Sequence, residues 1–482
     1  MERLLFILST KNDITYMYTK NKEVSHVLEK LFKLKENNTT LKTEVIAGIT
    51  TFMTMAYILA VNPDILGKAG MDKNAVLIAS ALASFIGCAL MALLSNYPFA
   101  LAPGMGLNAY FTYSVVIGMG IPWQFALFTV FVEGLIFILL SLTNVREAIF
   151  NAIPSTLKLA VSGGIGLFIA LIGFLNSKIA VSSDSTTITL RNFSSNFRSE
   201  SMGAILALIG VIITVVLLIR NVKGGILFGI LSTWILGIIA ELAGLYVPNP
   251  NLGMYSTIPS GIISFDFSSL GKTAFKVFTD IDFSSAKILD FIVIIFAFLF
   301  VDLFDTLGTL IGVSTKANML DEDGKLPRIK GALLADALAT SVGAILGTST
   351  TTTFVESASG VSEGGRTGLT SIVTGFLFLI SIFFSPLFLA IPSFATAPAL
   401  IVVGFYMLAN VVKIDFDDMS EAIPAFLCII AMPFTYSISE GISIGVISYV
   451  LINLFTGKFK EKKISVIMYI LTVLFIMKYI FL

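Results

Sequence analysis

Three carboxylates lie within or beside long apolar stretches of this sequence, where an ionised side chain is costly. Asp302 and Asp305 are three residues apart within Phe298–Gly308, so a helix would place both on one face. Glu356 follows the β-branched run Gly347–Thr353, at the expected start of a short helix whose dipole would support its charge. An ionised carboxylate at bilayer depth costs about 2.5–3.5 kcal/mol on insertion scales. Each of the three must therefore face a cavity, find a partner or take up a proton.

Two kinds of chemistry suit these carboxylates. When ionised, they can accept hydrogen bonds from ring N–H and exocyclic amino groups of a flat heterocycle. When buried, they can also load and release a proton as the site changes its exposure. The alternative is an internal salt bridge or a helix-packing hydrogen bond. That alternative weighs most for Asp305, since one of two neighbouring acids often only braces its helix.

The composition indicates a polytopic all-α membrane protein. The chain has 482 residues, of which 56% are hydrophobic and only 13% charged, with a mean hydropathy of +0.92. A soluble protein would carry about 25% charged residues. Apolar runs long enough to cross a bilayer recur from Val45 onward, and they are continuous rather than alternating, which favours helices over a barrel.

Several classes of function are disfavoured by what the sequence lacks. The 31 basic and 31 acidic residues balance to zero net charge, which argues against a nucleic-acid partner. The only histidine is His26 in the polar N-terminal arm, and Cys88 and Cys428 lie in apolar runs as small core residues. No Gly-x-x-x-x-Gly-Lys-Ser/Thr loop is present. We therefore expect no catalytic residues, no metal site and no cofactor, and a membrane enzyme is unsupported.

The charge pattern predicts a multi-pass protein of the cell membrane with a cytoplasmic N-terminus. The first 43 residues hold eight Lys or Arg, and the early apolar patch Leu4–Leu8 is too short for a signal peptide. We expect about fourteen segments in two sets of seven, the second inverted relative to the first. Residues 421–456 could be one broken span or two short ones around Pro433–Gly441, and 464–481 is taken as the last span.

Two segments at matching places in the two halves are abnormal. Tyr97–Asn108 holds two prolines and two glycines, so a helix cannot begin well before about Met105. Gly347–Thr353 is a β-branched run that prefers an extended chain. Each is expected to be a short extended piece followed by a half-helix, and such pairs point to a substrate site between them. A doubly broken, acid-lined centre also argues against an open channel.

Other polar and aromatic residues receive weaker interpretations. The Asn108 amide could bind a purine edge or merely cap a helix, and Gly106 beside it would let a ligand approach the backbone. Phe354 could stack on a base, as could Phe52 and Tyr57, although most aromatic residues in such a chain are core or lipid-facing. The buried acids outside these segments are interpreted as hydrogen bonds between helices; they are Glu133 and Asp336.

Several motifs together resemble one known family. They are Lys42–Ile58 (KTEVIAGITTFMTMAYI), Pro103–Phe111 (PGMGLNAYF), Asp302–Leu310 (DLFDTLGTL) and Thr350–Val361 (TTTTFVESASGV). In these motifs the chain resembles the AzgA-like purine permeases of the nucleobase–ascorbate transporter superfamily, from about residue 25 to the end.

This resemblance implies fourteen segments in a seven-plus-seven inverted repeat, with a core that moves against a gate as an elevator, within a homodimer. It implies transport of adenine, guanine or hypoxanthine with protons. Asp302 and Glu356 would contact the purine, Asn108 would contact it or shape the site with Gly106, and Asp305 would support the site. The expected parts are a cytoplasmic arm (1–43), the core (44–142 and 288–392), the gate (143–247 and 393–482) and an extracellular connection (248–287).

Two rival transport functions stay open at this point. A sulfate-permease-like anion transporter would share the fold, but acids at the half-helix ends argue against an anion. Sodium coupling is the second rival, because paired acids can also hold a cation.

Overall fold

The computed structural model describes residues 29–142, 153–183, 187–249, 252–282, 287–316, 319–321, 326–462 and 464–481. The first 28 residues of the expected N-terminal arm, including His26, lie outside the described residues. The first half forms α2 (Leu41–Met55), α3 (Ile58–Lys68), α4 (Lys73–Ser95), β1 (Leu101–Pro103), α5 (Met105–Ala109), the π-helix η1 (Tyr110–Gly118), α6 (Trp123–Leu142), α8 (Ser155–Asn176), β2 (Ala180–Ser183), β3 (Thr187–Leu190), the π-helix η2 (Phe197–Ser201), α9 (Met202–Ile219) and α10 (Gly225–Leu242).

The second half forms the 3₁₀-helix η4 (Ser268–Lys272), α11 (Lys276–Thr279), α12 (Ile288–Lys316), α13 (Ile329–Leu346), β4 (Thr351–Thr353), α14 (Ser357–Ser362), α15 (Gly368–Ser381), the 3₁₀-helix η6 (Ile382–Phe384), α16 (Ser385–Leu389), α17 (Ser393–Leu408), the 3₁₀-helix η7 (Ala409–Lys413), α18 (Met419–Thr435), α19 (Ile438–Phe455), α20 (Phe459–Lys462) and α21 (Val466–Phe481). Among the described residues, eleven helices are long and apolar enough to cross a bilayer. The prediction of a polytopic helical membrane protein is confirmed.

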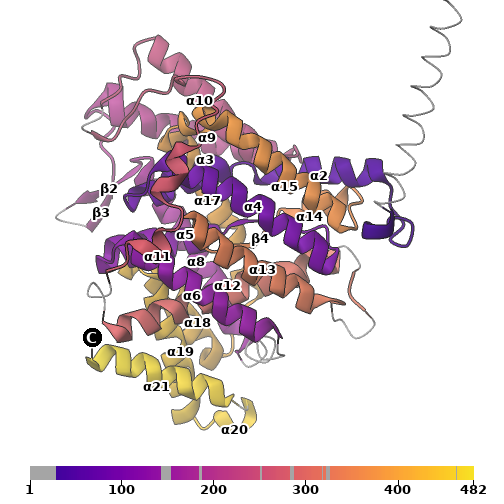
Figure 1. Cartoon of the computed structure of the whole chain (residues 1–482). Helices are drawn as coiled ribbons and strands as arrows, with labels where there is room; N and C mark the ends of the chain where they lie inside the picture. The colour runs from indigo at the N-terminus through magenta and orange to yellow at the C-terminus, as the bar shows by residue number, and fades with distance from the viewer. Residues whose placement is uncertain are drawn as a thin grey trace, which may run out of the picture.

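The spanning helices pack in two groups. In the first helix group, α2 to α6 pack with α12 to α15; in the second helix group, α8 to α10 pack with α17 to α19 (Figure 1). The backbones of α8 and α17 touch at Gly166 and Gly404, where a Cβ on either glycine would collide with the other's carbonyl oxygen. Small residues of this kind allow close helix packing in lipid. The exact boundaries of core and gate stay a prediction.

The C-terminal region takes the second of the two forms that the sequence left open, with two short helices in place of one broken span. Tyr436 has a φ of +57° and closes α18, and the Ser437 hydroxyl accepts from Glu440 N at 3.4 Å to begin α19. Residues 419–455 therefore form two separate helices, and α19 completes the second set of seven segments. α21 follows these two helices as a further apolar helix, in the stretch 464–481 that was taken as the last span. It packs on α19, and its Phe475 ring lies 5.6 Å from that of Phe296 in α12.

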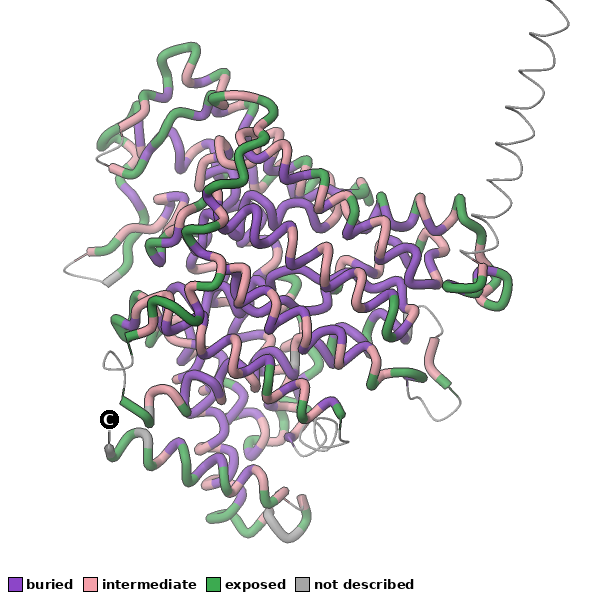
Figure 2. The backbone as a smooth tube through the Cα atoms, in the orientation of Figure 1, coloured by how far each residue is buried: buried purple, intermediate pink, exposed green. Residues whose placement is uncertain are grey.

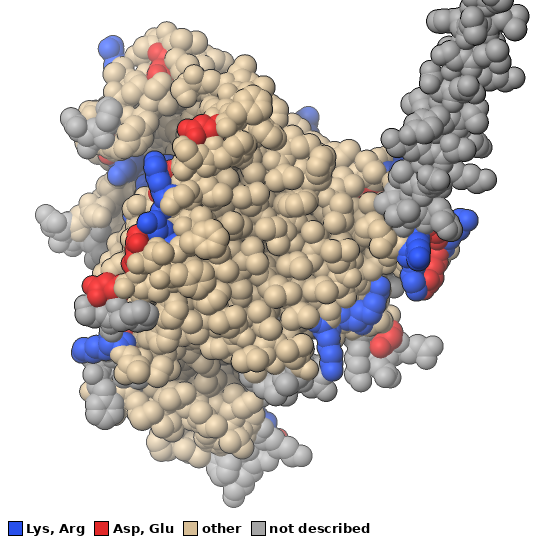
Figure 3. All heavy atoms as spheres, viewed as in Figure 1, with Lys and Arg blue, Asp and Glu red and all other residues tan. Residues whose placement is uncertain are grey.

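The surface has the layout of a membrane protein. Buried residues fill the interior of the helix bundle, while exposed stretches lie on its periphery (Figure 2). On the face shown in Figure 3, charged side chains gather along two opposite edges, and the surface between the edges carries almost none. Large apolar side chains such as Leu139, Ile212 and Ile235 are more than half exposed on the outer faces of spanning helices. These faces are suited to contact lipid.

Candidate substrate site

The two abnormal segments meet and pair with each other. β1 and β4 run antiparallel, with Leu101 opposite Thr353 and Pro103 opposite Thr351. The pairing extends at both ends, since Gly104 N donates to the Thr350 carbonyl at 3.0 Å and Phe354 N donates to the Ala100 carbonyl at 2.9 Å. Both strands are fully buried, so this pairing satisfies backbone groups that lipid could not. The predicted pair of extended pieces, each followed by a half-helix, is confirmed.

Glu356 lies where β4 gives way to α14 and is only partly exposed. Its Oε1 accepts a hydrogen bond of 2.7 Å from the hydroxyl of Tyr57, which is 1% exposed at the break between α2 and α3. α14 packs directly on α2, because a Cβ at Gly360 would collide with Thr51 and with the carbonyl of Ala47. The first span of the chain therefore fixes the position of this carboxylate.

Asp305 shares the region of Glu356. Its side chain is also partly exposed, and a methyl group added at Gly104 would lie 3.5 Å from its Oδ2. The carboxylates of Asp305 and Glu356 lie close enough for their charges to interact. Two acids from α12 and α14 thus lie beside the paired strands, and neither forms an ion pair with any described Lys or Arg.

Asp302 has a different environment in this conformation. It is fully buried, and its Oδ1 lies 3.0 Å from the hydroxyl of Thr306. The same hydroxyl lies 3.0 Å from both oxygens of Asp336 and 2.6 Å from the Thr352 hydroxyl, while Thr353 N donates to Asp336 at 3.1 Å. This network joins α12, α13 and β4. It places Asp336 between helices, as its interpretation as an interhelical contact expects, and direct contact of Asp302 with a substrate stays a prediction.

Asn108 lies next to the chain that leads into β4. It is fully buried in α5, and its Oδ1 accepts a hydrogen bond from the Ser349 hydroxyl. Within the described chain, its amide nitrogen is buried without a hydrogen-bond partner. The neighbouring Thr350 hydroxyl donates to Glu133 of α6 at 2.9 Å. Asn108 therefore offers an unused donor, which suits an acceptor on a ligand or a bound water.

The remaining candidates, one glycine and two aromatic residues, are in contact with neighbouring side chains. Gly106 faces the second helix group, because a Cβ there would lie 2.9 Å from Cγ2 of Ile165 in α8. Phe354 is only 6% exposed, and the Phe52 ring packs on Phe378 with centroids 5.2 Å apart. In this conformation the Phe354 ring is covered, whereas Phe52 is partly exposed. Stacking on a base stays a prediction for Phe354.

Sequence reasoning missed two tyrosine contributions at Glu356. It considered Tyr57 only as a stacking ring, whereas the hydroxyl of Tyr57 binds the carboxylate. Tyr406 of α17 is 50% exposed and close enough to Glu356 for electrostatic interaction, from the second helix group. The helix break at Tyr57 was not visible in the sequence as a proline or glycine, so no local signal marked it.

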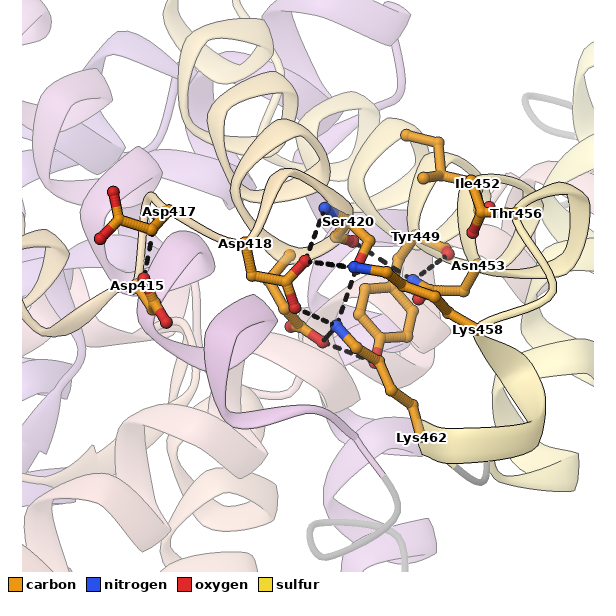
Figure 4. Close-up of polar contacts among 11 residues, drawn as sticks. Asp415, Asp417, Asp418, Ser420, Tyr449, Ile452, Asn453, Thr456, Lys458 and Lys462 are labelled. Carbon is orange, nitrogen blue, oxygen red and sulfur yellow. Dashed lines mark hydrogen bonds and ion pairs between the residues drawn. The ribbon is translucent and has the colours of Figure 1, made fainter.

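Among the described residues, no group of three or more His, Cys, Asp or Glu side chains is arranged to hold a metal ion. A different polar cluster lies at the ends of α18 to α20 (Figure 4). Asp418 accepts from Lys458 at 2.9 Å and from Lys462 at 2.7 Å, and Lys462 also pairs with Glu421 at 2.7 Å. The Tyr449 hydroxyl donates to Glu421 at 3.1 Å. We call these residues the lysine cluster.

Two discontinuous segments that meet inside a bundle of spanning helices, with carboxylates at their junction, are typical of secondary transporters. The chain belongs to the xanthine/uracil permease family, whose profile, described as the permease family, matches residues 42–444. It is 46% identical over 465 residues to the guanine/hypoxanthine permease PbuG of Bacillus subtilis (strain 168), covering 94% of this chain and all of the relative. It is 40% identical over 468 residues to the adenine permease AdeP of Escherichia coli (strain K12), covering 97% and 99%.

The fold is also that of a solved transporter. The transmembrane domain of the cyanobacterial bicarbonate transporter BicA superposes with a TM-score of 0.61 at 15% identity, covering 84% of this chain and 97% of that domain. At this identity the likeness shows the fold alone. The fold expected from the sequence, a seven-plus-seven arrangement of helical segments, is thereby supported, together with the family.

Proposed function

We propose that this protein imports purine nucleobases, namely adenine, guanine or hypoxanthine, together with protons. The observation that carries the proposal is the placement of Asp305 and Glu356, two partly exposed carboxylates beside the paired strands of the broken segments. Relatives that share 40–46% of its residues are named adenine and guanine/hypoxanthine permeases. The protein lies in the cell membrane with its N-terminus in the cytoplasm.

Recognition of a purine follows from the hydrogen-bond capacity of these groups. One oxygen of Glu356 is held by Tyr57, which leaves the other oxygen to accept from a ring N–H or an exocyclic amino group. Asp305 supplies a second acceptor, and Asn108 supplies an unused amide donor. A neutral, flat ring with donors and acceptors on its edge fits this set. An anion does not, because it would meet two carboxylates.

Proton coupling follows from the proximity of the two acids. Two ionised carboxylates repel each other, strongly so where the surroundings exclude water. A proton bound at either Asp305 or Glu356 removes this repulsion, so loading of the proton and of the base becomes linked. We assign this coupling to Asp305 and Glu356, with Asp302 as a buried support from the same helix.

Transport itself would be an elevator-type movement of the first helix group against the second, within a homodimer. Two polar ties join the groups at opposite ends. Asp64 of α3 accepts from Ser393 of α17 at 2.9 Å, and Lys223 pairs with Glu363 just after α14. Such ties would have to break in turn as the site faces one side of the membrane and then the other.

The test is uptake of labelled hypoxanthine into vesicles that contain the purified protein. We expect saturable uptake that depends on an inward proton gradient and competes with adenine or guanine but not with uracil. Uptake driven by sodium at equal pH would replace the proton with sodium as the coupling ion. Uptake of sulfate or bicarbonate without any purine uptake would refute the proposal and favour the anion alternative.

A further inference from the structure

The long connection between the two halves of the chain is fastened to both helix groups. We call residues 258–280 the strap. Just before it, the Thr257 carbonyl accepts from the indole of Trp234 at 2.6 Å, and Thr257 N donates to Glu241 at 2.7 Å, which ties it to α10. The strap then crosses to the first helix group between α10 and α11 (Figure 1).

Four polar contacts fix the strap along the ends of first-group helices. Ser264 N donates to the Phe383 carbonyl at 2.9 Å, and Lys272 pairs with Asp72 at 2.6 Å, beside the start of α4. At the end of α13, Thr273 donates through its hydroxyl to the Leu346 carbonyl at 3.2 Å, and Phe275 N donates to the Ile345 carbonyl at 2.7 Å. The strap is thus an ordered part of the fold.

Despite these anchors, the strap exposes large apolar side chains. The exposed fractions are 64% for Ile262, 54% for Ile263, 74% for Phe265, 61% for Phe275 and 53% for Phe278. Full burial of a side chain of this size is worth about 1.5–3 kcal/mol. Five large apolar side chains exposed to water within one segment of about 20 residues would be unusual on a soluble protein.

The aromatic contacts of the strap place it beside spanning helices, at positions inside the helices and not only at their ends. The Phe278 ring lies 5.1 Å from that of Phe131, on α6. Phe131 is eight residues beyond Trp123, the first residue of α6, which is about 12 Å along the helix axis. Phe265 lies 5.4 Å from the ring of Phe383, which belongs to the candidate span Gly368–Leu389. Neighbours at such positions on spanning helices lie within reach of lipid.

We propose that the strap is an interfacial segment of the bilayer, with Phe265, Phe275 and Phe278 in contact with lipid. Phe265, Phe275 and Phe278 are each more than half exposed, as are apolar side chains on the outer faces of spanning helices such as Leu139 of α6. On the face shown in Figure 3, charged residues gather at the edges. Within the strap, Lys276 pairs with Asp280 at 2.7 Å and both are at least partly exposed. Aromatic rings turned to the hydrocarbon boundary, with charged groups beside them, are the chemistry of an interfacial segment.

The experiment compares nitroxide spin labels at neighbouring positions of the full chain in lipid vesicles. The labelled variants are Phe265→Cys and Phe278→Cys, with Ser268→Cys and Thr279→Cys as exposed polar controls on the same strap. The unchanged chain is the labelling control, because Cys88 and Cys428 are both fully buried. Collision of each label with oxygen, which concentrates in lipid, is compared with collision with a water-soluble nickel chelate.

We expect the oxygen-to-nickel collision ratio to be several-fold higher at 265 and 278 than at 268 and 279. Equal ratios at all four positions would overturn the proposal and place the strap in water. Labels at 265 and 278 that neither reagent reaches would also overturn it, since a second protein surface would then cover the strap. Quenching of Trp by brominated lipid in Phe265→Trp, compared with the unchanged chain, gives a second measure that avoids labelling.

Discussion

Two groups of acids in this protein are held in opposite ways. In the lysine cluster, Asp418 and Glu421 share Lys462, and Asp418 also binds Lys458 (Figure 4). Beside the paired strands, Asp305 and Glu356 face each other's charge without a described Lys or Arg partner. One group is neutralised by the protein itself. The acids of the other group, Asp305 and Glu356, have no such cation from the described part of the protein.

This difference shows which carboxylates are available for function. An acid that is already paired gains little from a ligand, because the ligand would have to displace a lysine. An acid near a second acid gains from any bound proton or hydrogen-bond donor. The same side-chain chemistry therefore serves structure at the ends of α18 to α20, and between α12 and α14 it is left without a described cation, as the proposed substrate site requires.

The largest effect is expected where no cation balances the acid. Glu356→Gln should abolish purine uptake while the protein still inserts, because the amide cannot carry the coupling proton and its NH₂ group replaces one of the two acceptor oxygens with a donor. We expect the same loss for Asp302→Asn. A hydrogen bond to a charged group is worth about 1.5–3 kcal/mol, or roughly a 10- to 150-fold change. Initial uptake rates, normalised to the amount of inserted protein, provide the measurement.

Asp418→Asn is the matched control for these variants, since it makes the same change in an acid that lysines neutralise. Its uptake should stay near that of the unchanged chain. Normal uptake by both Glu356→Gln and Asp302→Asn would refute the site. Asp305→Asn sharpens the assignment: a loss as large as that of Glu356→Gln would support the coupling role proposed for both acids, whereas near-normal uptake would reduce Asp305 to a support of the site.

A smaller effect is expected for the tyrosine that positions Glu356. Tyr57→Phe removes one hydroxyl that donates to the carboxylate at 2.7 Å and leaves the buried ring in place. We expect about a tenfold loss of transport efficiency, seen mainly as a higher half-saturation concentration for purine.

Tyr449→Phe removes a similar hydroxyl, which donates to Glu421 at 3.1 Å in the lysine cluster. Its uptake kinetics should be unchanged. Equal kinetics for the two tyrosine variants would show that Tyr57 only fills space.

The smallest effect concerns stability and its dependence on pH. The Lys462 ammonium, followed by the Ser420 hydroxyl and Lys458, holds the pKa of Asp418 well below its usual range. The stabilisation is therefore present at neutral pH and is lost as the pH falls below about 4 towards the pKa of the folded state. Partly exposed ion pairs contribute about 0.2–1 kcal/mol.

Asp418→Asn should lower the unfolding temperature at pH 7 by a small amount and at pH 3 by a smaller amount, because part of the stabilisation is already lost there. Thermal unfolding of the purified protein in detergent at the two pH values provides the measurement. A larger destabilisation at pH 3 than at pH 7 would contradict the sign of this linkage.

Much of the fold could be predicted from the sequence because membrane-spanning helices have a strong local signal. Long apolar runs such as α9 and α12 need no partner to be recognised, since lipid demands about 20 apolar residues and an internally bonded backbone. The breaks before Met105 and Ser357 were equally local, because proline, glycine and a run of threonine determine them. The division at Tyr436 was left open, because one residue with a left-handed φ carries no pattern.

For the candidate site, the sequence suggested residues but not how they lie relative to one another. Asp302 and Asp305 were grouped by spacing alone, yet one is buried against Thr306 and the other is partly exposed near Glu356. Three residues on a helix differ by about 60° in direction. That angle is enough to turn one carboxylate into a packed network and the other towards the junction of the strands.

The sequence by itself determined that this protein lies in a lipid bilayer and that it is helical. It also determined the two broken segments and the acids next to them. These properties depend on composition and on neighbours within a few residues. Only the tertiary structure decided that β1 and β4 pair across 250 residues of chain, that Tyr57 holds Glu356, and that lysines neutralise Asp418 but not Glu356. The physical reason is that a carboxylate's role depends on which distant groups reach it, and packing alone settles that.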